Sequence, residues 1–540
     1  MRISQQPAPS SSPILCRRNA PGWAFIARFL IVMSVLLLPM QSPSASRRWA
    51  TGAAAPRNYP IARGEMQGPR RLAAAKAGDG LAKRRAGRRG GGSLRPSQHR
   101  RPRSRLRHLP HPNLQRDYRG SVAPGPQVPP SLPRRSERTL PGLPKAVARQ
   151  TLVLVDQAQP QSLGDDLAHA YRLQHLSSHP IALLSARVEL FRLPKQASEE
   201  AVLAALQRDG RVRSAQLNHR YFHTDMPEHA HSHRGGEEGK WRYLHAGNGG
   251  QAGAIAQYGP RKLGLPEAHR LALGRKVVIG VIDSYVDAAH PDLRSRVARS
   301  FNAAGGPDTS ADFHGTAVAG IIAAHGLVEG AAPEAKILAV RAFRTSGANA
   351  LPETTTHVLV TALDWAIASG AKILNMSLVG SPDPTLKQLL DAANRKGIVV
   401  VAAAGNGGPE APPAYPAAYP GVIAVTAVDE ADRRYEHANR GNYITVAAPG
   451  VDILAPVEQG GYAYVSGTSF AAAYVSGVAA LLLERDPSMR AGAVADLLAG
   501  GADSLGKAGL GGAGRNDDFG AGRVNAYASL KLLERYLAAH

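Results

Sequence analysis

The feature that most constrains the fold is a regular alternation of apolar runs and longer amphipathic stretches, which starts near residue 258. The near-continuous apolar runs occupy residues 277–282, 337–340, 373–376, 398–403 and 422–428. Runs of this kind are typical of strands buried on both faces, in a parallel sheet covered by helices. The stretches expected to form those helices are residues 314–324, 353–369, 384–396 and 469–484. The pattern therefore predicts an α/β fold with a mostly parallel sheet.

The first 150 residues differ in composition from this region. The whole chain holds 65 Lys and Arg against 41 Asp and Glu, a net charge of +24. Residues 1–150 hold 29 of the basic and 4 of the acidic residues, a net of +25, which leaves −1 for the remainder. Residues 47–150 are rich in Arg, Pro and Gly and cannot bury a core, so we expect disorder. A solvated spacer is favoured over an arm for anionic lipid, cell-wall polymer or nucleic acid, and no nucleic acid partner is expected.

The N-terminus carries the pattern of an export signal. An apolar run at 29–40 follows three arginines, Arg17, Arg18 and Arg28, and small residues stand after it at 44–46. This order predicts a signal peptide over residues 1–46, and the run is shorter than the roughly 20 residues of a membrane-spanning helix. We expect an exported protein, either secreted, periplasmic or associated with the cell envelope. A retained anchor that contacts the membrane through residues 23–40 is the alternative.

A small α+β domain is predicted over residues 151–224. Strands are expected at 152–155, 183–193 and 212–221, with helices at 163–173 and after Ser198. A unit of roughly 75 residues is near the lower limit for folding alone, so a partner surface is expected. The next segment, 225–254, is rich in His, Gly and charge, and it is interpreted as a linker rather than a metal site despite the alternation of His229, His231 and His233.

Three residues that can carry catalysis follow the predicted strands or begin the predicted helices. Asp283 ends the run at 277–282, while His314 and Ser469 each begin a helix. Each alone has an ordinary structural explanation, such as an N-cap for Ser469. Together they supply a nucleophile, a general base and a carboxylate that orients the base, at the edge where open parallel sheets carry their sites. Backbone N–H groups at the start of the Ser469 helix also favour a developing oxyanion.

The motifs around these residues resemble the subtilisin-like serine proteases. Val281-Ile282-Asp283-Ser284, then His314-Gly315-Thr316, then Ser466-Gly467-Thr468-Ser469 occur in the family's Asp, His, Ser order, and the resemblance covers about residues 255–530. It implies an α/β fold, a subtilisin-like doubly wound sandwich with a mostly parallel central sheet, preceded by a small ferredoxin-like α+β propeptide domain. It also implies an exported serine endopeptidase, made as a zymogen, that acts on protein or peptide substrates.

The resemblance assigns roles to further residues. Asp283, His314 and Ser469 form the catalytic triad, Asn406 helps to form the oxyanion hole, and Ser377, Leu378 and Val379 pair with an extended substrate by β-augmentation. Residues 151–224 act as an intramolecular chaperone and inhibitor, and the catalytic domain spans 255–540. Self-cleavage is implied between about residues 221 and 250, from the end of the α+β domain into the linker.

No metal ligand is predicted and no cofactor is expected to be required. Calcium is frequent in the family, but no carboxylate cluster in the sequence is specific enough to assign a site. The segment 509–514 spells a dinucleotide-binding pattern, but it follows no strand and opens no helix, so it is interpreted as a loop.

Four residues depart from the family pattern. Tyr285 and Val379 stand where glycine is usual, and Ala473-Tyr474 replaces a Pro-His pair. Val379 is expected to narrow the approach of a substrate backbone. None of these changes removes a proton-transfer group. The alternative function is a catalytically inert or weakly active binding protein, anchored at the cell surface by the basic N-terminal arm.

Overall fold

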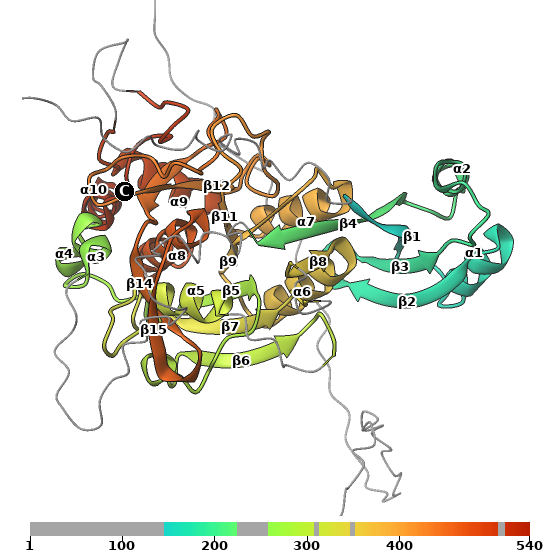
Figure 1. Ribbon diagram of the computed structural model, residues 1–540, viewed down its shortest axis with the longest axis horizontal. Coiled ribbons are helices and arrows are strands. Elements are labelled where there is room, and N and C mark those ends of the chain that lie inside the picture. The colour runs from blue at the N-terminus through green and yellow to red at the C-terminus, as the bar shows by residue number, and fades with distance from the viewer. Residues whose placement is uncertain (1–144, 224–256, 307–312, 346–350, 506–513, 540) are drawn as a thin grey trace, which may run out of the picture. The chain divides into compact units, whose positions relative to one another are not determined.

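The computed structural model describes residues 145–223, 257–306, 313–345, 351–505 and 514–539 (Figure 1). All of them belong to one compact unit, Val122–His540. The predicted signal peptide, nearly all of the basic region, the linker at 225–254 and most of the glycine-rich loop lie outside the described residues. No described helix is both long and apolar enough to cross a membrane.

The centre of the unit is a seven-stranded sheet in which every pair of neighbouring strands is parallel. The strand order is β13-β12-β11-β9-β5-β7-β6. Their bounds are β5 Val278–Asp283, β6 Val297–Asn302, β7 Lys336–Arg341, β9 Ile373–Met376, β11 Val399–Ala403, β12 Ile423–Val428 and β13 Val446–Pro449. The five predicted strands form as expected. The two edge strands were not predicted, because β6 is largely solvent-exposed and polar and β13 is four residues long and ends in proline.

Helices cover both faces of this sheet (Figure 1). Helices α5 (His314–Ala323) and α8 (Thr468–Arg485) share one hydrophobic core, and α6 (Thr356–Ala368) and α7 (Pro384–Arg395) share the other. Strand β5 serves both cores, since Ile279 and Val281 belong to the first and Ile282 to the second. Burial on both faces explains the continuous apolar runs of the sequence.

Helix α6 begins later than predicted, because residues 353–355 form a short strand, β8 (Glu353–Thr355). The Thr355 side chain caps the helix by accepting a hydrogen bond from the Val358 N–H at 3.4 Å. Asp383 caps α7 in the same way through the Leu386 N–H at 2.9 Å. Oxygen-bearing side chains at these positions satisfy backbone donors that the helix itself leaves unpaired.

Shorter elements complete this part of the unit. They are α3 (Tyr258–Lys262), α4 (Leu265–Ala268), η3 (Pro291–Leu293), β10 (Leu378–Gly380), the antiparallel pair β14 (Ile453–Val457) and β15 (Gly461–Val465), η4 (Glu458–Gly460), α9 (Ala491–Gly500) and α10 (Ala526–Ala539).

Residues 146–223 form the α+β domain that was predicted over 151–224, with the ferredoxin-like order βαββαβ. Its first strand begins at Ala146, so residues 146–150 are not disordered, contrary to the expectation. Its elements are β1 (Ala146–Asp156), α1 (Leu163–Tyr171), β2 (Gln174–Ile181), η1 (Ala182–Leu184), β3 (Ala186–Arg192), α2 (Glu199–Arg208) and β4 (Ser214–His223). The antiparallel strand order is β4-β1-β3-β2. Strand β2 was not predicted, because it is a polar edge strand that contains Pro180. The strand expected from residue 183 begins at Ala186, after η1.

The α+β domain packs against the helices of the central sheet. Along β1, Leu152 and Leu154 belong to the core that contains α6 and α7, whereas Val153 and Val155 pack against α1 and α2. This alternation follows the two-residue period of a strand. The partner surface expected for so small a domain is therefore the outer side of α6 and α7.

Candidate active site

Asp283 and His314 form a buried hydrogen-bonded pair. Asp283 ends β5 and is 0% exposed, and His314 is the first residue of α5 and is 3% exposed. The His314 Nδ1 and Asp283 Oδ1 atoms are 2.7 Å apart. A carboxylate on Nδ1 favours the tautomer in which Nδ1 carries the proton and Nε2 can accept one.

The backbone around the pair fixes its position. The Ser284 N–H donates to Asp283 Oδ1 at 2.7 Å, and the Gly315 N–H donates to Ser284 Oγ at 3.0 Å. A Cβ atom on Gly315 would come 2.7 Å from the Tyr285 carbonyl oxygen, so glycine is required for this close approach of α5 to the end of β5.

The charge of Asp283 is stabilised although the residue is buried. Burial alone would raise the pKa of its carboxyl group. The charge and hydrogen bond of His314, the nearby His223 and the Ser284 N–H outweigh burial and hold this pKa below its ordinary value. Asp283 is therefore ionised at neutral pH and can stabilise a positive charge on His314.

Ser469 lies in the first turn of α8, close to this pair. It is 0% exposed, and the ring of the next residue, Phe470, lies 5.5 Å from the His314 ring between centroids. The single proton of the Ser377 hydroxyl is shared between two acceptors, the Ser469 carbonyl oxygen at 3.3 Å and Asn375 Oδ1 at 3.1 Å. The start of α8 is thereby joined to the segment between β9 and β10.

Asn406 follows β11 and is held by the residue before Ser469. Its Oδ1 accepts hydrogen bonds from Thr468 N at 3.1 Å and Thr468 Oγ1 at 2.9 Å. The Thr468 hydroxyl in turn accepts from the Gly405 N–H at 3.2 Å. Because Oδ1 faces Thr468, the amide nitrogen of Asn406 is directed away from Thr468. An amide held in one orientation can donate to an oxyanion without reorganisation.

Strand β10 carries Leu378 and Val379, two of the residues predicted to bind substrate, and β4 lies on it. Leu378, Val379 and Gly380 pair antiparallel with His223, Phe222 and Tyr221. Strand β8 pairs with the other edge of β4. An extended chain thus lies along the segment where β-augmentation of a substrate was predicted. Val379 takes part in this pairing, opposite Phe222.

His223, the last residue of β4, reaches the Asp283–His314 pair, and it was not among the predicted site residues. Its ring stacks on the His314 ring, with centroids 4.3 Å apart and planes 17° from parallel. The centroid of the Phe343 ring lies 3.9 Å from that of His223. His223 Nε2 lies 3.6 Å from Asp283 Oδ1. Only the distant pairing of β4 with β10 brings this side chain to the site, so no local pattern could have found it.

His223, Asp283 and His314 also offer donor atoms within 4.8 Å of one another, as a metal site would. The lone pairs of an imidazole lie in the plane of its ring, so two nearly parallel stacked imidazoles cannot both direct one at the same ion. In addition, His314 Nδ1 and Asp283 Oδ1 are already hydrogen-bonded to each other. We interpret the group as a carboxylate–imidazole pair covered by a second imidazole.

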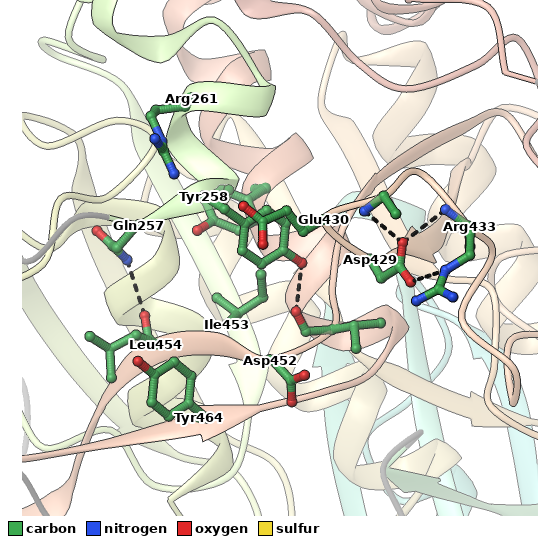
Figure 2. A pocket seen from close by; sticks show the side chains of 14 residues that line it. Gln257, Tyr258, Arg261, Asp429, Glu430, Arg433, Asp452, Ile453, Leu454 and Tyr464 are labelled. Carbon is green, nitrogen blue, oxygen red and sulfur yellow. Dashed lines mark hydrogen bonds and ion pairs between the residues drawn. The ribbon is translucent and has the colours of Figure 1, made fainter. Parts of the chain in front are cut away.

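The replacement of Pro-His by Ala473-Tyr474 affects packing. Both residues are buried in α8. A Cβ atom on Gly259 would come 2.6 Å from the Tyr474 hydroxyl oxygen, so Tyr474 points toward α3. Tyr474 lines a cavity of about 650 Å³ together with residues that include Tyr258, Asp452 and Tyr464 (Figure 2). None of the predicted catalytic residues lines this cavity.

Comparison with known proteins identifies the family. The Subtilase family model matches residues 274–522. Subtilisin DY of Bacillus licheniformis is 38% identical over 240 residues, which are 43% of this chain and 86% of that protein. Thermitase of Thermoactinomyces vulgaris is 36% identical over 282 residues, 51% of this chain and 96% of that protein. The chain belongs to the subtilase family. It is a serine endopeptidase, and its substrates are proteins.

A solved structure is also similar to this chain. Fervidolysin from Fervidobacterium pennivorans, described as a keratinolytic enzyme related to subtilisin, matches with a TM-score of 0.59 and 25% identity. The match covers 72% of this subtilase and 61% of fervidolysin. The 72% of this chain that is covered is a larger part than residues 274–522, which the family model matches. The predicted fold class, a subtilisin-like α/β fold with a mostly parallel central sheet, is confirmed.

Proposed function

We propose that this subtilase cleaves peptide bonds through an acyl-enzyme formed on Ser469. His314 removes the proton from the Ser469 hydroxyl as this oxygen attacks the substrate carbonyl carbon, and then gives the proton to the leaving amine. Asp283 orients the imidazole and stabilises its positive charge. Water then attacks the acyl-enzyme with His314 again as base, which releases the second product and restores the serine. The buried 2.7 Å contact between His314 and Asp283 supports these roles.

The oxyanion of each tetrahedral intermediate is stabilised in this proposal by two N–H donors. One is the side-chain amide of Asn406, and the other is the backbone N–H of Ser469 at the start of α8. The hydrogen bonds from Thr468 to Asn406 support the first donor because they preset its orientation. Preorganised donors stabilise developing charge more than solvent does.

The α+β domain acts in our proposal as a propeptide that occupies the substrate position. The observation that carries the proposal is the strand β4, which lies on β10 while its last residue stacks on His314. A substrate cannot pair with β10 while β4 is there. The domain therefore inhibits the protease, and its packing on α6 and α7 helps the protease domain to fold.

The register of β4 on β10 suggests which bond is cut. His223, the last described residue of β4, pairs with Leu378, and the residue before Leu378 is Ser377, whose hydroxyl contacts the Ser469 carbonyl oxygen. We propose self-cleavage between Thr224 and Asp225, at the start of the linker. This bond lies within the range expected from the sequence, and it divides the propeptide from the linker and protease domain.

We further propose that the protein is exported. The support is the signal-like pattern of residues 1–46 together with the membership of a family that includes subtilisins. Calcium stays without an assigned site.

A serine-directed phosphonylating reagent tests the catalytic assignment. The processed protein should gain the mass of one phosphonyl group, located on Ser469 by peptide mapping, and lose activity in proportion. Ser469→Ala should not be labelled, whereas the surface control Ser488→Ala should be labelled as the wild type is. Labelling of another serine, or none in a folded and processed protein, would contradict the assignment.

A further inference from the structure

Strand β4 presents Tyr221 to a closed pocket of the protease domain. Tyr221 is 0% exposed, and its backbone lies between Gly380 of β10 and Thr354 of β8. A Cβ atom on Gly380 would come 2.3 Å from Cδ1 of the Tyr221 ring, so only glycine leaves room for the aromatic ring there. The ring belongs to the core formed by α6 and α7, with Leu378 among its members.

The pocket has a charged end, which is the carboxylate of Asp383. This residue is 1% exposed and caps α7 through the Leu386 N–H, which donates to Oδ1. Its Oδ2 accepts from the Thr356 hydroxyl at 2.5 Å and lies 3.0 Å from His219 Nδ1. Burial alone would raise the pKa of Asp383, but the hydrogen bonds from His219, Leu386 and Thr356 hold it below its ordinary value. In the unprocessed protein Asp383 is therefore a buried anion. His219 belongs to β4 and leaves with the proposed propeptide, whereas Leu386 and Thr356 belong to the protease domain and stay as donors to the carboxylate.

Tyr221 lies on the same face of β4 as His219, two residues before it, and the His219 ring reaches Asp383, so the Tyr221 side chain is directed to the same end of the pocket. Its hydroxyl makes no hydrogen bond of standard geometry with the described residues, but burial and then the charge of Asp383 raise the pKa of the hydroxyl well above its ordinary value. A carboxylate offers about four acceptor positions. In the unprocessed protein His219 and Gln216 of β4 act on Asp383 beside Leu386 and Thr356, and the first two leave with the α+β domain. The processed enzyme then has acceptor positions free for the phenolic O–H of a substrate. A small rotation of either side chain would supply the hydrogen bond that a buried hydroxyl requires.

We infer that Asp383 is a specificity-determining residue, which selects protein substrates with tyrosine four residues before the cut bond. That position is the one Tyr221 holds on β4. The inference rests on the proposed function, because it takes β4 as the guide to how a substrate lies on β10. The tyrosine ring fills the apolar part of the pocket, and its O–H donates to Asp383. Phenylalanine fills nearly the same volume but places an apolar ring edge against a buried charge.

Three internally quenched peptides test this selection on the processed wild-type enzyme. The first has the sequence of residues 220–227, and the others replace its tyrosine by phenylalanine or by 4-fluorophenylalanine, which matches the size of tyrosine but has no O–H. We expect kcat/KM to be at least about ten-fold higher for the tyrosine peptide, the factor typical of a hydrogen bond to a charged group. Equal or faster cleavage of the phenylalanine peptide would overturn the inference.

The variant Asp383→Ser tests the residue itself. Serine retains a helix N-cap but does not extend to the phenol. The tyrosine-to-phenylalanine ratio of kcat/KM should fall to about one to two. The control Asp391→Ser, which removes a surface partner of Lys387 on the same helix, should keep the wild-type ratio. A folded Asp383→Ser enzyme that retains the ten-fold preference would refute the assignment.

The possible failures are distinguishable. If the three peptides are cut at the same bond with equal kcat/KM, the inference about Asp383 is wrong and the proposed function stands. If a folded, processed enzyme cuts none of them or any other peptide, the proposed function fails and the inference fails with it. If Asp383→Ser does not fold, the comparison of the three peptides on the wild type decides the question alone.

Discussion

The imidazole of His223 lies face to face with the imidazole of His314, with ring centroids 4.3 Å apart. The first residue belongs to the α+β domain and the second to the protease domain. The contact places the end of the domain proposed as a propeptide directly on the proposed general base, and it links inhibition to the catalytic machinery.

Replacing His223 should weaken this inhibition. Stacked aromatic pairs contribute roughly 1 kcal/mol beyond the area they bury, or about a five-fold change in binding. We expect His223→Ala to shorten, by about five-fold, the lag before activity appears after processing. His223→Phe should retain the stack and most of the lag. A lag unchanged in both variants would show that the stacking contributes nothing to inhibition.

Acid should destabilise the unprocessed protein through His357. Burial, followed by the neighbouring His179, lowers the pKa of His357 to about 4. Its neutral ring lies 3.0 Å from the Ser177 hydroxyl, across the contact between the α+β domain and α6. Since the charged form is disfavoured in the folded state, the contribution is fully present above an unfolded pKa of about 6.5 and is lost as pH falls through about 4.

This loss is measurable in the uncleaved Ser469→Ala protein. The pKa difference of about 2.5 corresponds to at most about 3 kcal/mol of unfolding free energy. Urea unfolding should show that the unfolding free energy of the Ser469→Ala protein is lower at pH 4 than at pH 7.5. This difference should be smaller in the double variant Ser469→Ala, His357→Gln. His325→Gln, a histidine of the protease domain outside this contact, is the comparison. An equal drop in the protein with and without His357→Gln would rule out this histidine as the source.

Loss of the Asn406 amide should reduce turnover far more than binding. Removal of the corresponding donor in subtilisin, a relative of this chain, lowers kcat by about 100- to 1,000-fold, and we expect the same range for Asn406→Ala. KM should change little, because the donor acts on charge that develops in the transition state. The surface variant Asn394→Ala should match the wild type. A rise in KM with unchanged kcat would instead assign Asn406 to substrate binding.

The pocket for Tyr221 can be tested by enlarging the residue at position 380 on β10 and then shortening the residue at position 221 on β4. Gly380→Ala should impair processing severely, since its Cβ atom would overlap the Tyr221 ring. Combining it with Tyr221→Ala removes the overlap and should restore self-cleavage to a large part. A double variant as impaired as Gly380→Ala would show that the defect arises from the protease domain alone and not from the contact with Tyr221.

The sequence predicted the central strands and main helices because their apolar patterns are local. It also predicted where Asp283, His314 and Ser469 lie on those elements, since each follows a buried run or opens a helix. Strands β2 and β6 were missed because they are polar edge strands, half solvated and without a continuous apolar run. Local patterns carry little information about such strands.

The contacts of β4 could not be predicted, for a different reason. Tyr221 and His223 meet Gly380 and His314 through pairing between segments far apart in the chain. Nothing near Asp383 in sequence distinguishes it from an ordinary helix cap. Its role as a buried charge at the end of a pocket emerges only when α6, α7 and β4 are brought together.

The most direct test of the account is intact mass and N-terminal sequencing of the protein expressed without residues 1–46, beside its Ser469→Ala variant. We predict that the wild type cuts itself to give a chain beginning at Asp225, while the variant stays whole. Such a result would support the triad and the substrate-like position of β4 together. A wild type that remains uncut, or a variant cut at the same bond in the same preparation, would contradict self-cleavage by Ser469.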